Sequence, residues 1–183
     1  EHEVETLPCG LVSVMGGKWT TCRPMALDTL AAVEQQLGQP LPSPKAMVLL
    51  GSGATPTATR DELETQTNQL ETLLPNTPQR AAQIEHLQGS HGLQAVPMIE
   101  AADPEKRAPL SDVIPLCEAE ISHAIQSEHA RSSTDVLARR CRLAMVDFAE
   151  AQRLEPLVET YLAQSGLVSG ATSTSPMSHQ LNP

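Results

Sequence analysis

A double glycine at positions 16 and 17 divides the chain into a short β-like part and a long helical part. Before it, His2–Leu7 alternates weakly, while Leu11–Met15 is apolar on both faces, which favours a buried strand. The turn signal at Pro8–Gly10 lies between these runs, so they predict a β-hairpin. After the double glycine the apolar residues adopt helical spacing, at Ala26, Leu30, Val33 and Leu37, and Gly38 marks the end of that helix.

The remainder carries helix signals. Three prolines between 39 and 44 indicate a linker. We expect one helix capped by Thr59 or Asp61, and a second capped by Thr77 that starts at Pro78 and ends at Gly89. Two more are expected over Leu93–Ala101 and from about Leu116 to Arg131. One continuous helix is expected after Ser133, with a single stripe of Leu137, Cys141, Ala144 and Phe148. Pro156 is expected in the first turn of the last helix, which Gly166 ends.

These elements predict a mainly α fold, in which a short β-hairpin with one helix precedes a small all-α domain. The expected boundaries are residues 1–38 for the first part, 39–58 for the linker and 59–166 for the helical domain. Residues 167–183 are rich in Ser, Thr, Pro and Asn, and we expect them to be disordered.

Composition excludes several classes of protein. The net charge of −10 argues against a nucleic-acid partner, because phosphate binding needs clustered Lys and Arg. No apolar run approaches the ~20 residues of a membrane-spanning helix. None of the 4 cysteines forms a C-x-x-C pair, so reduced packing thiols are expected rather than disulfides or a zinc site. The chain begins at Glu1 and enters a strand pattern at once, which suggests a piece of a longer protein.

The chemistry is concentrated in the stretch Gly16-Gly17-Lys18-Trp19-Thr20. Paired glycines let a ligand approach the main chain closely, and a helix start attracts negative charge. Lys18 adds a cation at the same point, so a phosphate, a carboxylate or the polar end of a reduced flavin would suit it. A P-loop is excluded, because it needs Gly at Val12 and Ser or Thr at Trp19. A plain strand-to-helix turn with a solvated lysine stays open.

Two motifs resemble FAD-dependent glycerol-3-phosphate dehydrogenases. The first is Gly16-Gly17-Lys18-Trp19-Thr20-Thr21-x-Arg23 with the following Met25-Ala26-x-Asp28-Thr29. The second is Glu118-Ala119-Glu120-Ile121, then Glu128, then Asp135 to Ala144, which is similar to the all-helical C-terminal domain of that family. The two motifs occur in the family's order, and the resemblance spans roughly residues 2 to 166.

The resemblance implies that residues 1–38 are the C-terminal edge of an FAD-binding α/β domain. It implies that Gly16, Gly17, Lys18, Trp19 and Thr20 line FAD, and that Lys18 acts in catalysis beside N1 and the C2 carbonyl of the flavin. The implied reaction oxidises sn-glycerol 3-phosphate to dihydroxyacetone phosphate and passes electrons to a quinone. A cytoplasmic location, peripheral to the inner membrane, is implied likewise, and a homo-oligomer stays open.

The chain also departs from the family. It has no G-x-G-x-x-G dinucleotide fingerprint, so we expect that it neither holds FAD tightly nor turns over substrate alone. Cys22 and Cys141 replace a tyrosine and a threonine of the family pattern. Two alternatives remain: a helical interaction or oligomerisation module without chemistry, and a fragment of a related flavin oxidase that uses oxygen.

The charged residues of the second motif predict structure rather than a further site. Arg139, Arg140 and Arg142 are expected to pair with Glu118, Glu120 or Glu128 of the preceding helix. Asp135 is expected to be a helix cap or a first-turn carboxylate rather than a catalyst. No metal site is expected, because His123 and His129 do not share a helical face.

Overall fold

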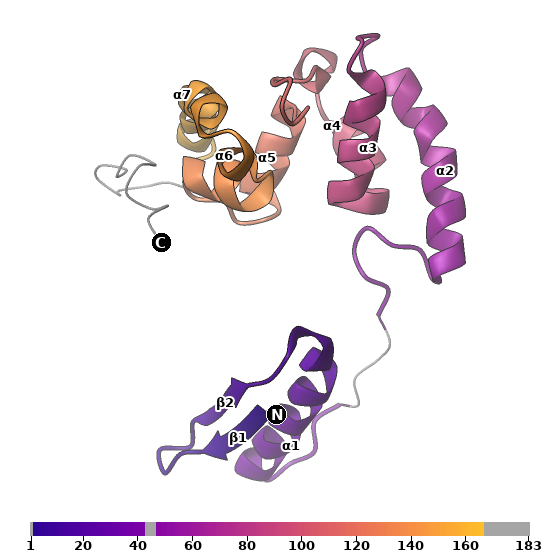
Figure 1. The fold of residues 1–183 in the computed structure, drawn as a ribbon. Coiled ribbons are helices and arrows are strands. Elements are labelled where there is room, and N and C mark those ends of the chain that lie inside the picture. Colours follow the sequence, from indigo (N-terminus) through magenta and orange to yellow (C-terminus); the bar gives the residue numbers. More distant parts are fainter. Residues whose placement is uncertain (1, 43–46, 167–183) are drawn as a thin grey trace. The chain divides into compact units, whose positions relative to one another are not determined.

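The computed structural model describes residues 2–42 and 47–166, which belong to two compact units divided between Met47 and Val48. The described elements are helices and one two-stranded sheet, so the mainly α fold class is confirmed (Figure 1). Residues 43–46 of the expected linker and the expected disordered tail, 167–183, lie outside the described residues. In the described ranges, no helix combines the length and the apolarity that a membrane span requires.

The first unit is a hairpin with one helix beside it (Figure 1). Strands β1 (His2–Thr6) and β2 (Val12–Gly16) pair antiparallel, with His2 opposite Gly16, which confirms the predicted hairpin. A 3-10 turn, Trp19–Thr21, leads into α1 (Cys22–Leu37), and Gly38 ends α1 in the left-handed conformation as expected. A hydrogen bond of 2.8 Å between His2 Nε2 and the Asp28 carboxylate ties β1 to α1.

The expectation of a buried strand at Leu11–Met15 is wrong for the described part of this unit. Val14 is 42% exposed and Met15 is 53% exposed, and no described residue of the unit is fully buried. The physical reason is that two strands and one helix cannot enclose an apolar core. Several apolar side chains of β2 and α1, among them Val14, Met15 and Leu30, therefore remain exposed.

The second unit contains the helices α2 to α7 and two aliphatic cores. Its first half holds α2 (Pro56–Leu73), α3 (Arg80–His91), a 3-10 turn (Gly92–Gln94) and α4 (Ala95–Ala101). A 3-10 turn (Pro104–Arg107) follows, and the second half holds α5 (Glu118–Gln126), a π-helical turn (Asp135–Arg140), α6 (Leu143–Val146) and α7 (Phe148–Gln164). The fully buried side chains include Leu70, Leu87, Ile99, Ile121, Leu137 and Val158.

Two expected helix starts were wrong. Helix α2 begins at Pro56 because Thr55 is its cap, with the Ala58 N–H donating to Thr55 Oγ1 at 3.1 Å. Helix α3 begins at Arg80 because Thr77 lies in the preceding turn, where its carbonyl accepts the Arg80 N–H. Helix α3 also passes through Gly89 and ends at His91, and Gly92 then adopts a positive φ.

The expected continuous helix after Ser133 is also wrong, because the backbone breaks twice. Arg142 adopts a left-handed φ of 62° after the π-helical turn, and Asp147 separates α6 from α7. The Asp147 carboxylate caps α7 by accepting the Glu150 N–H at 2.9 Å, which puts Pro156 inside the helix rather than in its first turn. Similarly, α5 ends at Gln126 rather than Arg131, since His129 has a φ of 57°.

Candidate functional site

The turn between β2 and α1 depends on its two glycines. Gly16 and Gly17 have φ values of 74° and 96°, a region that side chains with a Cβ rarely adopt. A Cβ on Gly17 would also lie 2.3 Å from the Met25 sulfur, so the end of the Met25 side chain would have to move to make room for one. The paired glycines therefore set the path of the chain into Lys18.

Lys18 is held by its backbone while its side chain stays exposed. The Lys18 N–H donates to Thr21 Oγ1 at 3.2 Å, and the Thr21 hydroxyl donates to the Lys18 carbonyl at 2.9 Å. The Lys18 N–H is one of the amides that were expected to bind an anion at the helix start, and it already donates a hydrogen bond within the turn. The next residue, Trp19, is 92% exposed. The turn therefore presents a cation and an indole to their surroundings from a fixed backbone.

An open hollow of about 690 Å³ lies beside this turn. This volume is in the range of small-molecule sites. Lys18 is the one charged residue of its lining, and Thr20 lies outside it. The lining residues are Val14, Gly16, Gly17, Lys18, Trp19, Cys22, Met25, Ala26, Thr29 and Leu30. Four of the five predicted cofactor-binding residues therefore meet at one mostly apolar surface with a single cation, which suits a flat ring with an electron-rich edge.

The second sequence motif forms a polar network in the other unit, centred on Glu120. This side chain is only 7% exposed. Its Oε1 accepts hydrogen bonds from His86 Nε2 at 2.8 Å and His91 Nε2 at 3.1 Å, and its Oε2 accepts the Cys117 N–H at 2.9 Å. Burial acts to raise the pKa of Glu120, but the hydrogen bonds from His86 and His91 outweigh it and lower the pKa to about 2. The carboxylate is therefore ionised and joins α3 to α5.

The expected ion pairs are confirmed in part. The Arg140 Nε lies 4.0 Å from a Glu128 carboxylate oxygen, as predicted. Arg139 instead pairs with Asp135 at 2.5 Å, one helical turn away, because its side chain lies on the Asp135 side of the π-helical turn. Arg142 makes no ion pair within the described residues.

Asp135 is the acidic residue in the first turn of the π-helical segment, which is one of the two roles expected for it. Its Oδ2 accepts the N–H groups of Arg131 and Ser132 at 3.0 and 3.1 Å. Burial acts to raise its pKa, but these hydrogen bonds and the Arg139 guanidinium lower it overall. A further motif residue, Glu118, accepts a hydrogen bond from the Tyr161 hydroxyl of α7. The described residues of the second motif thus hold the helices together.

Sequence reasoning missed one cluster of side chains in this unit. The sequence analysis compares His123 with His129, but His129 is exposed and His123 faces His91 instead, with ring centroids 5.5 Å apart. Burial lowers the pKa of His123, which favours the neutral ring. The only sequence signal was the presence of two histidines on separate helices, and local periodicity cannot pair helices that are distant in the sequence.

A family model and several individual proteins that match this chain agree on one family. Residues 44–169 match the family described as the C-terminal domain of alpha-glycerophosphate oxidase. The mitochondrial glycerol-3-phosphate dehydrogenase of Arabidopsis thaliana is 34% identical over 172 residues, which cover 87% of this chain and 27% of that protein. The mitochondrial protein of the same name from Homo sapiens is 30% identical over 164 residues, covering 86% and 21%. Glycerol-3-phosphate dehydrogenase 2 of Mycobacterium bovis is 31% identical over 149 residues, covering 79% and 24%. The chain thus spans about a quarter of the length of these relatives.

Proposed function

This chain belongs to the family of the C-terminal domain of alpha-glycerophosphate oxidase, and on that premise we propose that it forms the C-terminal part of an FAD-dependent glycerol-3-phosphate dehydrogenase. The proposed reaction oxidises sn-glycerol 3-phosphate to dihydroxyacetone phosphate and delivers the electrons to a quinone. The observation that carries the proposal is the Gly16-Gly17-Lys18 turn, which lies ahead of the matched domain and opens onto a ligand-sized hollow.

The residues of the turn fit a flavin edge. Gly16 and Gly17 expose bare backbone, and Trp19 offers an exposed aromatic surface. When bound, FAD supplies the acceptor for the hydride that leaves the secondary alcohol carbon. Lys18 would place an ammonium beside the edge of the ring that gains negative charge, and a positive charge at that position in the bound complex lowers the barrier. Thr20 is not part of the hollow, so its proposed contact with FAD would be made by the outer side of the 3-10 turn.

The chain alone is proposed to bind FAD weakly, because the hollow lies open on a unit with no buried core among its described residues. The test compares this chain with the complete protein that contains it. The complete protein should purify with stoichiometric flavin, which glycerol 3-phosphate bleaches under anaerobic conditions, while the separate chain should be colourless. A colourless complete protein, or one whose flavin glycerol 3-phosphate does not bleach, would contradict the proposal.

An oxidase is the second candidate, because the matched family is described by an oxidase while the relatives above are named dehydrogenases. The two differ in the acceptor that reoxidises the flavin. Stoichiometric hydrogen peroxide during turnover would favour the oxidase, and turnover that depends on an added quinone analogue would favour the dehydrogenase.

The proposed location is the surface of the inner membrane. Two of the relatives are named as mitochondrial proteins, and a quinone acceptor is dissolved in a membrane. Sedimentation of the complete protein with vesicles tests this proposal, and release by high salt would show a peripheral contact. Analytical ultracentrifugation of the same protein decides whether it forms a homo-oligomer.

A further inference from the structure

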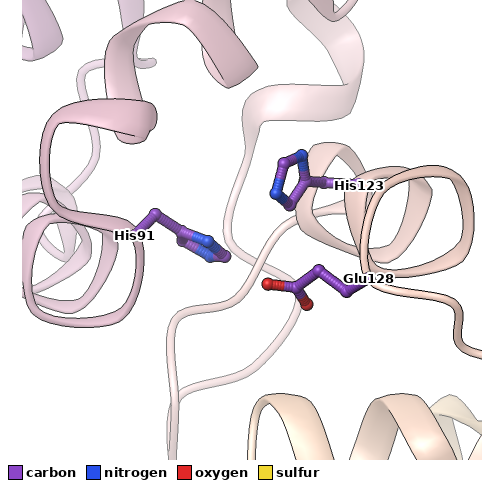
Figure 2. Close-up of side chains that lie close together, drawn as sticks. All are labelled: His91, His123 and Glu128. Carbon is purple, nitrogen blue, oxygen red and sulfur yellow. The ribbon is translucent and has the colours of Figure 1, made fainter. Parts of the chain in front are cut away.

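Three side chains of the second unit bring metal-binding atoms together. His91 is the last residue of α3, His123 lies in α5, and Glu128 lies in the loop after α5. Their ligand atoms all lie within 4.8 Å of one another, and Figure 2 shows the Glu128 carboxylate reaching toward the two imidazole rings. The rings of His91 and His123 stand nearly perpendicular, at 88°. Two nitrogen donors and one carboxylate are therefore available at a single point.

The His91 ring is oriented from behind by Glu120. His91 Nε2 lies 3.1 Å from a carboxylate oxygen of Glu120, and the tautomer that makes this contact a hydrogen bond to a carboxylate carries its proton on Nε2. This tautomer leaves the lone pair on Nδ1. Metal-binding histidines usually donate their other ring N–H to a carboxylate in this way, which fixes the ring and strengthens the ligand. The pair of Glu120 and His91 thus has the arrangement of a ligand with its supporting carboxylate.

His123 has a lone pair to offer as well. Within the described residues 2–42 and 47–166, its ring makes no hydrogen bond, and it approaches the His91 ring edge-on. The side chain comes from the middle of α5, so the backbone of a regular helix holds it in place.

The loop after α5 folds Glu128 back toward the two rings. His129 takes a left-handed φ of 57°, and the Ala130 N–H then donates to the Ala124 carbonyl at 2.9 Å. Arg140 approaches one Glu128 carboxylate oxygen at 4.0 Å and donates to the Glu128 backbone carbonyl at 2.5 Å. The guanidinium therefore anchors the loop and leaves the second carboxylate oxygen to face the rings.

We propose that His91, His123 and Glu128 form a binding site for a divalent transition-metal ion of the zinc class. Two imidazoles and one carboxylate are a ligand set that suits Zn²⁺, with water in the fourth position. Tetrahedral Zn²⁺ with nitrogen and oxygen ligands places neighbouring ligand atoms roughly 3.4 Å apart. The three ligand atoms lie within 4.8 Å of one another, so side-chain rotations would have to bring them to that spacing around the ion. The ion would join the end of α3 to α5, and this proposal does not depend on the proposed flavin function.

The test titrates Zn²⁺ alone into the metal-stripped chain by isothermal titration calorimetry. One equivalent should bind, and the melting temperature should rise by roughly 5–10 °C when free Zn²⁺ is about 100-fold above Kd. The H123N variant should bind Zn²⁺ at least 10-fold more weakly. The H129N variant is the matched control, since His129 is exposed and Asn tolerates its left-handed backbone; it should bind like the wild type.

A second variant separates loss of ligation from loss of folding. E128Q keeps the size of the loop side chain and its backbone contact with Arg140, so it should preserve the helical circular dichroism and still weaken Zn²⁺ binding at least 10-fold. Co²⁺ bound in place of Zn²⁺ should show no thiolate charge-transfer band. The proposal is overturned if the wild-type chain does not bind Zn²⁺, or if folded H123N or E128Q binds Zn²⁺ with wild-type affinity. A thiolate band in the Co²⁺ spectrum would also overturn it, because it would place the metal on the exposed Cys9 or Cys22.

Discussion

Replacement of Glu120 by glutamine should unfold the second unit at markedly lower denaturant concentration. The carboxylate is buried and accepts three hydrogen bonds, from His86, His91 and the Cys117 N–H. An amide in its place can accept on one side only, and its NH₂ group then faces a donor. A hydrogen bond to a charged group is worth about 1.5–3 kcal/mol, and a buried donor left unpaired costs about 1–3 kcal/mol. We therefore expect a loss of about 2–4 kcal/mol in the free energy of unfolding.

The assay is urea unfolding of the 183-residue chain with a metal chelator present, followed by far-UV circular dichroism. The matched control is Glu85→Gln, because Glu85 lies on the exposed side of α3 and its replacement should change the free energy of unfolding by less than about 0.5 kcal/mol. If both variants unfolded at the wild-type midpoint, the Glu120 network would not join α3 to α5 in the way described above.

Two further predictions concern thiol reactivity and pH. Burial raises the pKa of Cys117 to about 12, while Cys9 and Cys22 are exposed, so iodoacetamide should alkylate Cys9 and Cys22 first in mass spectrometry; early labelling of Cys117 in folded protein would refute this. Burial acts to raise the pKa of Asp135, but its hydrogen bonds outweigh burial and lower the pKa in the folded state. The stability that the ionised Asp135 contributes to the fold is therefore complete above its unfolded pKa of about 3.9, and it is lost as the pH falls through the lower folded pKa. Unfolding curves of Asp135→Asn should therefore depend less on pH below about 4 than those of the wild type, and an unchanged dependence would contradict this sign.

The parts of the fold that were predictable are set by local chemistry. The hairpin follows from the turn signal at Pro8–Gly10, and the path into α1 follows from the Gly16-Gly17 turn. The positive φ values of Gly10, Gly16 and Gly17 are ones that only glycine adopts readily. The buried stripe of α5 follows from the helical spacing of Ile121 and Ile125. The break at Arg142 was missed because its left-handed conformation depends on packing between α6 and the preceding π-helical turn.

The candidate site was predictable to a similar extent. The residues of the Gly16–Trp19 turn are consecutive, so their motif could be recognised and they meet at one hollow. The cluster of His91, His123 and Glu128 draws on two helices and a loop, and the pairing of α3 with α5 through Glu120 is a tertiary contact without a local pattern. Sequence periodicity places each side chain on a helix, but it does not state which helices meet.

We propose that Lys18 stabilises the negative charge that develops on the flavin. The most direct test is stopped-flow measurement of flavin reduction by glycerol 3-phosphate in the complete protein. Lys18→Met keeps the length of the side chain and removes its charge. We predict that it slows reduction of bound flavin about 100-fold or more, the usual effect of removing one preorganised charge-stabilising group, while Lys18→Arg retains part of the rate. Reduction of Lys18→Met at the wild-type rate would contradict the assignment of this turn to the flavin site.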